Sequence, residues 1–193
     1  LIQKIEEAAQ ETKVVERKTK VSDDVVRLDT LFPAYVKFLR HQRKLTENFI
    51  NSHPNRQKIN NQIKKWNGFN EHLTQWESLV DSYEKSNIRR MERIQISETI
   101  WKLTYEKTRD QNIPTEVARR VKETYDEISG LSKQIKRRNN EYLILESRIN
   151  MQKVDIADVI EQLEKLKESK IYDLFYQSHK HLWKLGYSDF SIE

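Results

Sequence analysis

The sequence predicts an all-α protein, an elongated antiparallel three-helix coiled-coil bundle. Only three glycines and three prolines occur in 193 residues, so the chain has few places to turn and its elements must be long. Hydrophobic residues make up 36% and charged residues 34%, which suits a thin bundle with a narrow core and much surface. Apolar residues recur at helical spacing nearly throughout, so the high charge does not indicate disorder.

The first expected helical arm covers about residues 1–52. A Ser-Asp-Asp sequence at residues 22–24 is typical of a helix start, so the arm is either one helix or two. Pro33 either bends this helix or lies in its first turn. Pro54 predicts a chain reversal, because a proline disfavours helix in the residue before it. Three further apolar residues are expected to widen the buried stripe of this arm: Leu31, Phe38 and Leu45.

The second expected arm covers residues 56–110. Its apolar residues share one helical face from Ile59 to Tyr83 and keep their phase across Gly68, which is therefore interpreted as a weak point or kink and not a boundary. After Tyr83 the pattern slips by about one helical step before it resumes at Met91, which predicts a local unwinding of the supercoil. Pro114 marks the second chain reversal.

The third expected arm, residues 115–176, has an unbroken heptad repeat. Every seventh residue is apolar: Val121, Ile128, Ile135, Tyr142, Ile149, Ile156 and Leu163. Arg138 and Gln152 fall on the second core position of the heptad, where looser packing is expected. At about 1.5 Å per residue such a helix is roughly 80 Å long, so a rod is predicted. Three arms of similar length predict a single domain with up-down-up topology, followed by an aromatic tail at residues 177–193.

The net charge of +5 gives a weak preference for anionic partners. Basic clusters occur at residues 40–44, 89–93 and 136–138, but each has acidic neighbours, so a solvated helix face is favoured over a nucleic-acid or membrane site. No nucleic-acid partner is expected. The chain also lacks an apolar run near the roughly 20 residues that a membrane span needs. Because it begins with Leu1, we interpret it as a soluble piece of a longer protein.

No catalytic constellation is recognisable, and the chain is predicted not to be an enzyme. Cysteine is absent, which excludes thiolate nucleophiles and cysteine-bound metals. His179 and His181 form the one close histidine pair, and a metal site would need further ligands, so no metal or cofactor is expected. Trp66, Trp76 and Trp101 fall in phase with the apolar stripe and are interpreted as core residues.

The second half of the chain carries a pattern of short motifs in a fixed order. A Trp-x-x-Thr pair precedes a proline turn, a long helix, a Leu-Phe pair and a Leu-Trp pair: Trp101 and Thr104, Pro114, Leu174 and Phe175, Leu182 and Trp183. This run resembles the extracytoplasmic coiled-coil region that precedes the membrane spans in long members of the small-conductance mechanosensitive channel (MscS) family. The chain departs from that family at residues 178–181, where the family tends to have an acidic residue and prolines.

The resemblance implies a periplasmic domain on the outer side of a bacterial inner membrane, tethered by transmembrane helices outside this sequence. Its partners would be the other subunits of a homo-oligomeric ion channel, with cell-envelope components or the lipid surface as further candidates. Such a domain would tune gating, and the isolated fragment is expected to be monomeric. A membrane-curvature module of the BAR type, also built from three long helices, and a spectrin-like spacer remain alternatives.

Overall fold

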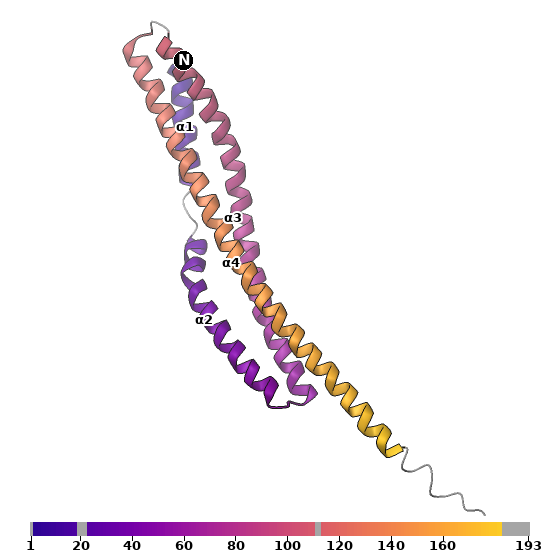
Figure 1. Ribbon diagram of the computed structural model, residues 1–193. Coiled ribbons are helices and arrows are strands. Elements are labelled where there is room, and N and C mark those ends of the chain that lie inside the picture. Colours follow the sequence, from indigo (N-terminus) through magenta and orange to yellow (C-terminus); the bar gives the residue numbers. More distant parts are fainter. Residues whose placement is uncertain (1, 19–22, 111–112, 183–193) are drawn as a thin grey trace, which may run out of the picture. The chain divides into compact units, whose positions relative to one another are not determined.

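The computed structural model describes residues 2–18, 23–110 and 113–182. Within these ranges the protein is all-α, as predicted, and contains no strand. The described residues form four helices, labelled in Figure 1: α1 (Ile2–Lys18), α2 (Asp23–Asn51), α3 (Arg56–Asp110) and α4 (Thr115–Leu182).

The first arm is two helices and not one, so the prediction of three helices is corrected to four. The buried residues explain the break. Within α1 the pair Ile5 and Thr12 is buried at heptad spacing, and within α2 the pair Val25 and Phe32 is buried at the same spacing. Val25 follows Thr12 by thirteen residues, one fewer than two heptads, so one continuous helix could not keep both stripes on the same face.

Pro33 lies in the interior of α2, eleven residues into the helix, so the interpretation that it occupies the first turn is wrong. The helix begins earlier because Asp23 and Asp24 occupy its first turn, where negative charge is favoured by the helix dipole. The prediction that three further apolar residues widen the buried stripe is also wrong. Their side chains are exposed: Leu31 by 58%, Phe38 by 41% and Leu45 by 48%.

The first predicted chain reversal is confirmed between Asn51 and Arg56. His53 has a φ of 51°, in the left-handed region that lets the chain leave α2, and Pro54 is buried beside it. Asn55 caps α3, since its Oδ1 accepts a hydrogen bond of 2.9 Å from the backbone N of Lys58.

The second predicted reversal is also confirmed, between Asp110 and Thr115. The carbonyl oxygen of Pro114 accepts the first hydrogen bonds of α4, at 2.9 Å from the N of Val117 and 3.1 Å from the N of Ala118. Proline suits this position because a backbone N–H there would have no hydrogen-bond partner within the helix. The N–H that proline lacks is therefore not missed.

The heptad phase of α3 does not slip, contrary to the prediction. The buried residues keep seven-residue spacing along the helix: Ile59, Trp66, Leu73, Val80, Asn87, Ile94, Trp101 and Thr108. The apparent slip came from Asn87, a polar residue that fills the core position after Val80. α3 also continues through Gly68, which is no boundary, as expected.

All seven predicted heptad residues of α4 are buried, the most exposed being Tyr142 at 7%. The polar positions Arg138 and Gln152 are half-buried. α4 extends to Leu182, so residues 177–182 are helical and do not belong to a separate tail. Between Gly130, which lies inside α4, and Gly186 the sequence has no Gly or Pro that would end the helix sooner. The rest of the predicted tail, residues 183–193, lies outside the described residues.

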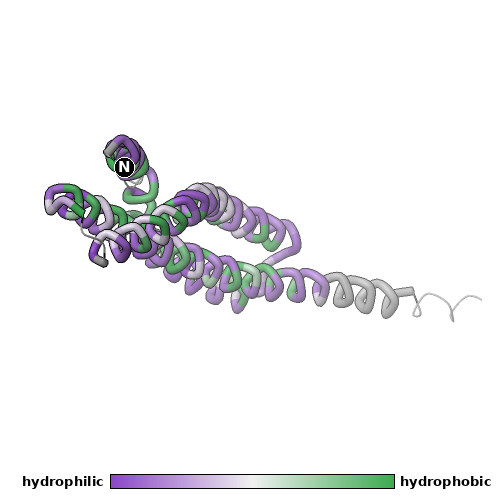
Figure 2. Tube along the Cα trace, turned by 90° about the horizontal axis from the view of Figure 1, so that it is seen from above, coloured by the Kyte–Doolittle hydropathy of each residue, from purple (hydrophilic) through white to green (hydrophobic). Residues whose placement is uncertain are grey.

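The chain divides into two compact units: unit 1 comprises residues 1–30 and 76–149, and unit 2 residues 31–75 and 150–193. Figure 2 shows hydrophobic residues recurring among hydrophilic ones along the helices. In unit 1, α1, α3 and α4 share one core: Ile5, Ala8, Ile94, Trp101, Val121, Ile128, Leu131 and Ile135. α3 and α4 run antiparallel in this unit, because Asn87 contacts Ile135 while Tyr105 stacks on Tyr125 at 5.9 Å.

Candidate functional site

Two of the tryptophans selected from the sequence are core residues, as predicted. Trp66 is 2% exposed in unit 2, where its Nε1 donates a 3.0 Å hydrogen bond to Thr46 Oγ1 and its ring meets the edge of Phe69 at 5.3 Å. Trp101 is 7% exposed in the core of unit 1. Trp76 is only half-buried. The burial and the satisfied indole N–H give Trp66 a packing role.

Each motif residue whose side chain is described has a local structural role. Thr104 is one turn from Trp101 on α3, and its hydroxyl donates to the carbonyl of Ile100 at 2.8 Å, a bond within the helix. Pro54 lies between α2 and α3, and Pro114 lies between α3 and α4. Leu174, Phe175 and Leu182 belong to the last part of α4, but their side chains lie outside the described residues, and so does Trp183.

Unit 1 has an apolar groove between α1 and α3. Two overlapping hollows of about 810 and 520 Å³ share five lining residues: Glu7, Glu11, Arg93, Ile96 and Ser97. Three apolar side chains along it are exposed, Val14 at 49%, Ile96 at 64% and Ile100 at 56%. We call this feature the α1–α3 groove. Its acidic residues come from α1, and Arg93 provides a positive charge from α3.

The sequence analysis does not predict the α1–α3 groove. Ile96 and Ile100 stand four residues apart on α3, and Leu103 follows three residues later with 53% exposure. This spacing forms a second apolar stripe beside the heptad core, and it is the signal that could have revealed the groove. Such a stripe can bind an apolar helix face, but it offers no group for acid–base or nucleophilic chemistry.

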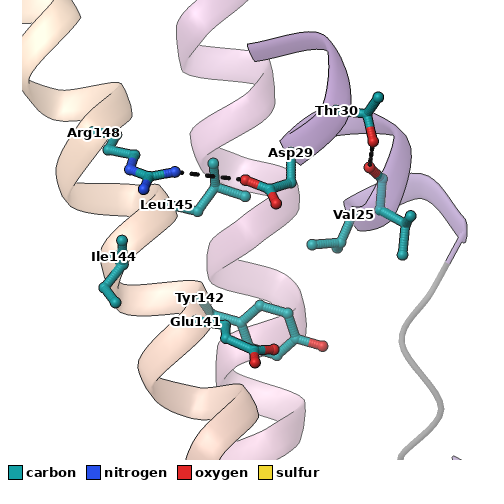
Figure 3. A pocket seen from close by; sticks show the side chains of 9 residues that line it. Val25, Asp29, Thr30, Glu141, Tyr142, Ile144, Leu145 and Arg148 are labelled. Atoms are coloured by element: carbon teal, nitrogen blue, oxygen red, sulfur yellow. Dashed lines mark hydrogen bonds and ion pairs between the residues drawn. The ribbon is translucent and has the colours of Figure 1, made fainter. Parts of the chain in front are cut away.

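A second groove of unit 1, of about 350 Å³, lies between α2 and α4. Figure 3 shows the Asp29 carboxylate of α2 and the Arg148 guanidinium of α4 facing one another across it, at 3.7 Å. Val25 and Leu145 contribute apolar surface. Both members of the ion pair are more than half exposed, so their attraction contributes at most about 1 kcal/mol to stability.

Glu84, on α3 in unit 1, lies close to other carboxylates. The pKa of Glu84 is raised by burial and by the negative charges of Glu146 and Asp81, while Lys85 opposes the rise. Burial also raises the pKa of Tyr142. Paired carboxylates are used in acid–base catalysis, but Glu84 lines neither of the two grooves described above.

Charged residues on the surface form local pairs. Glu161 pairs with Lys165, and within the basic cluster at 136–138 Arg137 pairs with Glu141. Across the described ranges, no three His, Asp or Glu residues group closely enough to hold a metal ion. None of the helices in the same ranges combines the length and hydropathy of a membrane span.

The comparisons with known proteins add no assignment. No family model, curated protein or solved structure matches this chain.

Proposed function

We propose that this chain is a non-enzymatic helical interaction domain, built as an elongated antiparallel three-stranded coiled coil in which α1 and α2 together form one strand. The buried heptads of α2, α3 and α4 support this architecture. The one-residue deficit between Thr12 and Val25 supports the pairing of α1 with α2 as a single interrupted strand.

The α1–α3 groove is the observation that carries the interaction role. Soluble proteins seldom leave large apolar side chains exposed at regular spacing unless a partner covers them. Three apolar side chains of α3 are each more than half exposed: Ile96, Ile100 and Leu103. Other apolar residues of the same helix are buried in the core. The groove is therefore proposed to hold an apolar helix face or loop of a partner protein.

In a longer parent, the domain would act as the extracytoplasmic regulatory part of a mechanosensitive channel of the MscS family. The motif order from Trp101 to Trp183 supports this proposal. The rod would tune gating from the periplasmic side through neighbouring subunits, envelope components or the lipid surface, and would conduct no ions itself. A ligand or partner can shift gating only if its contacts differ in free energy between closed and open states. The C-terminal end around Phe175, proposed to lie nearest the first span, would transmit that difference.

Patch-clamp recording of the parent channel tests this proposal. Deletion of residues 1–193 should leave conductance unchanged and alter the tension threshold or inactivation. The double substitution Ile96→Ser and Ile100→Ser should reproduce part of that change, because it removes the exposed apolar surface without touching the core. Val154→Ser is the matched control, since Val154 is equally exposed, at 62%, but lies in unit 2.

The alternatives give different results in the same set of measurements. Unchanged gating after the deletion, in native envelope as well as in bare bilayer, would reject regulation and leave a passive spacer. Strong binding and tubulation of anionic vesicles by the isolated fragment would favour a membrane-curvature module.

A further inference from the structure

Unit 2 carries a stripe of exposed apolar side chains on α2. Leu31, Phe38 and Leu45 follow one another at seven-residue spacing, so they share one side of the helix and stand roughly 10 Å apart along it. The residue after each of them is buried in the core. The residue before Phe38 is Lys37 and the residue before Leu45 is Lys44, and both lysines are exposed. The stripe therefore lies between the core and two solvent-facing cations.

Aromatic contacts join this stripe to α3. Phe38 meets the edge of Phe69 with ring centroids 5.3 Å apart, and Tyr35 lies between Phe38, at 5.9 Å, and His72, at 5.2 Å. The Tyr35 hydroxyl donates a 3.4 Å hydrogen bond to the carbonyl oxygen of Phe69. Lys65 Nζ lies 5.8 Å from the centroid of the Phe69 ring, where the ring attracts a cation. We define the α2–α3 face by six residues: Leu31, Phe38 and Leu45 of α2, and Lys65, Phe69 and His72 of α3.

Positive charge is concentrated in the same part of the chain. Residues 31–75 contain eight Lys or Arg against two Glu and no Asp, a net charge of +6, whereas all 193 residues together carry +5. Lys37 and Lys44 form no ion pair with any described residue. The positive charge beside the α2–α3 face is thus not neutralised within the described part of unit 2.

The acidic residues of unit 2 lie away from this face. Glu47 pairs with Arg43 at 3.5 Å, and Arg43 also pairs with Asp155 of α4 at 3.7 Å, so both carboxylates belong to the side of α2 that meets α4. Glu71 follows Phe69 by two residues, about 200° around α3, and so points to the other side of that helix. Every other acidic side chain in the described part of unit 2 belongs to α4.

An anionic lipid surface accounts for both the charge and the apolar stripe. Basic side chains are attracted to anionic headgroups, while apolar tips enter the boundary between headgroups and acyl chains, about 5–10 Å deep. A bilayer accepts apolar side chains that stand singly, whereas a partner helix needs a continuous hydrophobic groove. A nucleic acid would use the cations and the aromatic rings, but the aliphatic tips of Leu31 and Leu45 would gain little from it.

We propose that the α2–α3 face binds an anionic lipid surface, with Leu31, Phe38 and Leu45 in the interface and the lysines at the headgroups. The protein partner proposed for the α1–α3 groove belongs to unit 1, and this lipid contact belongs to unit 2. The proposal is independent of the channel assignment, so it holds even if deletion of the domain leaves gating unchanged.

Co-sedimentation of the full chain with vesicles tests the role of charge. The chain should bind vesicles of phosphatidylglycerol and phosphatidylcholine in equal parts, without tubulation, and much more weakly to phosphatidylcholine alone. Each basic residue near an anionic surface strengthens binding by a factor of about five, so Lys37→Gln combined with Lys44→Gln should weaken it about tenfold or more. The matched control is Lys133→Gln combined with Lys136→Gln, which removes the same charge from exposed positions of unit 1 and should bind nearly as well as the wild type.

The two exposed leucines test the apolar contact. Leu31→Ser combined with Leu45→Ser leaves the net charge unchanged and should weaken vesicle binding about tenfold or more, because two apolar side chains no longer leave water. Val154→Ser is the control, since Val154 is exposed on α4 of the same unit, and it should bind like the wild type.

The position of the face can be measured directly, because the chain contains no cysteine and an introduced thiol is unique. A polarity-sensitive fluorophore on Leu45→Cys should shift its emission to the blue when vesicles are added, and nitroxide-labelled lipids should quench it. The same fluorophore on Val154→Cys should show neither change.

Four results would overturn the proposal. Equal binding to phosphatidylcholine vesicles would remove the role of charge, and equal losses in the two pairs of lysine variants would mean that net charge alone explains binding. A lipid-exposed label at Val154 with a water-exposed label at Leu45 would place the contact on another face. Binding of polyglutamate or a single-stranded oligonucleotide as tightly as the vesicles would assign the face to an acidic protein or to a nucleic acid instead.

Discussion

Glu84 of α3 and Glu146 of α4 place two carboxylates close together at half-buried positions. Burial is the main cause of the raised pKa of Glu84, and repulsion by Glu146 and Asp81 follows. A group whose pKa is higher in the folded state than in the unfolded state adds stability when it is protonated. That contribution is complete below the unfolded-state pKa and is lost as the pH rises through the folded-state pKa.

Glu84→Gln is therefore expected to unfold at higher urea concentration than the wild type at pH 7, because the variant keeps a neutral group where the wild type must ionise. The advantage should shrink as the pH falls through the carboxylate range. Glu92→Gln, on an exposed face of the same helix, is the control and should track the wild type. If the unfolding free energies of Glu84→Gln and the wild type differ by the same amount from pH 7 to pH 4, the ionised Glu84 does not destabilise the fold.

The burial of single residues was predictable from the sequence in some cases and not in others. The burial of Trp66 and Trp101 was predictable from their phase with the heptad, whereas Trp76, assigned to the same stripe, is only half-buried. Asn87 was not, since an asparagine in a charged helix normally faces solvent. Its core place depends on a carbonyl acceptor, that of Ile135, on a helix distant in the sequence.

At the scale of the helices, the α4 repeat is the part that the sequence predicted best. Every seventh residue from Val121 to Leu163 is apolar, so a single heptad register applies to that whole stretch of the helix. All of these residues are buried. The sequence does not decide whether the chain breaks between α1 and α2, because the capping residues at 22–24 predict a new helix while apolar residues continue at helical spacing. The sequence predicts too early an end for α4, because aromatic residues suggest a tail, although no Gly or Pro occurs between Gly130 and Gly186.

The register of α4 makes a direct prediction for stability. Ile135 and Ile149 are fully buried, so replacing either with alanine should lower the free energy of unfolding by about 2 kcal/mol or more, through lost burial and the cavity left behind. Lys136→Ala, next to Ile135 but exposed, should change it by no more than about 0.5 kcal/mol. Chemical denaturation monitored by circular dichroism gives the values. Similar losses at core and surface positions would be incompatible with this register.

At the scale of the whole molecule, the proposed interaction surface could not have been predicted as such. The sequence contains the α3 stripe of Ile96, Ile100 and Leu103, but a second stripe on a helix is equally compatible with a wider core. Leu31, Phe38 and Leu45 illustrate the ambiguity, because they were expected to be buried and are exposed. Only the packing of the neighbouring helices decides which apolar stripe is covered.

The two units share their longest helices, and this determines how a disturbance in one reaches the other. α3 passes from unit 2 into unit 1 without a break, and α4 passes back. Helix formation is cooperative, so melting a long helix in one unit removes hydrogen-bonded turns that support the next. We therefore expect the units to unfold together.

Leu163→Ala in unit 2 tests this coupling, because Leu163 is fully buried and its truncation should cost about 2–5 kcal/mol. Native-state hydrogen exchange should then show the same loss of protection around Ile128 in unit 1 as around Ile156 in unit 2. Gln162→Ala, at the exposed neighbouring position, should leave both regions unchanged. Loss of protection confined to unit 2 would mean that the units open separately. A domain of that kind could not carry a bias from the α1–α3 groove to the C-terminal end of α4, and the proposed control of gating would have to act within unit 2 alone.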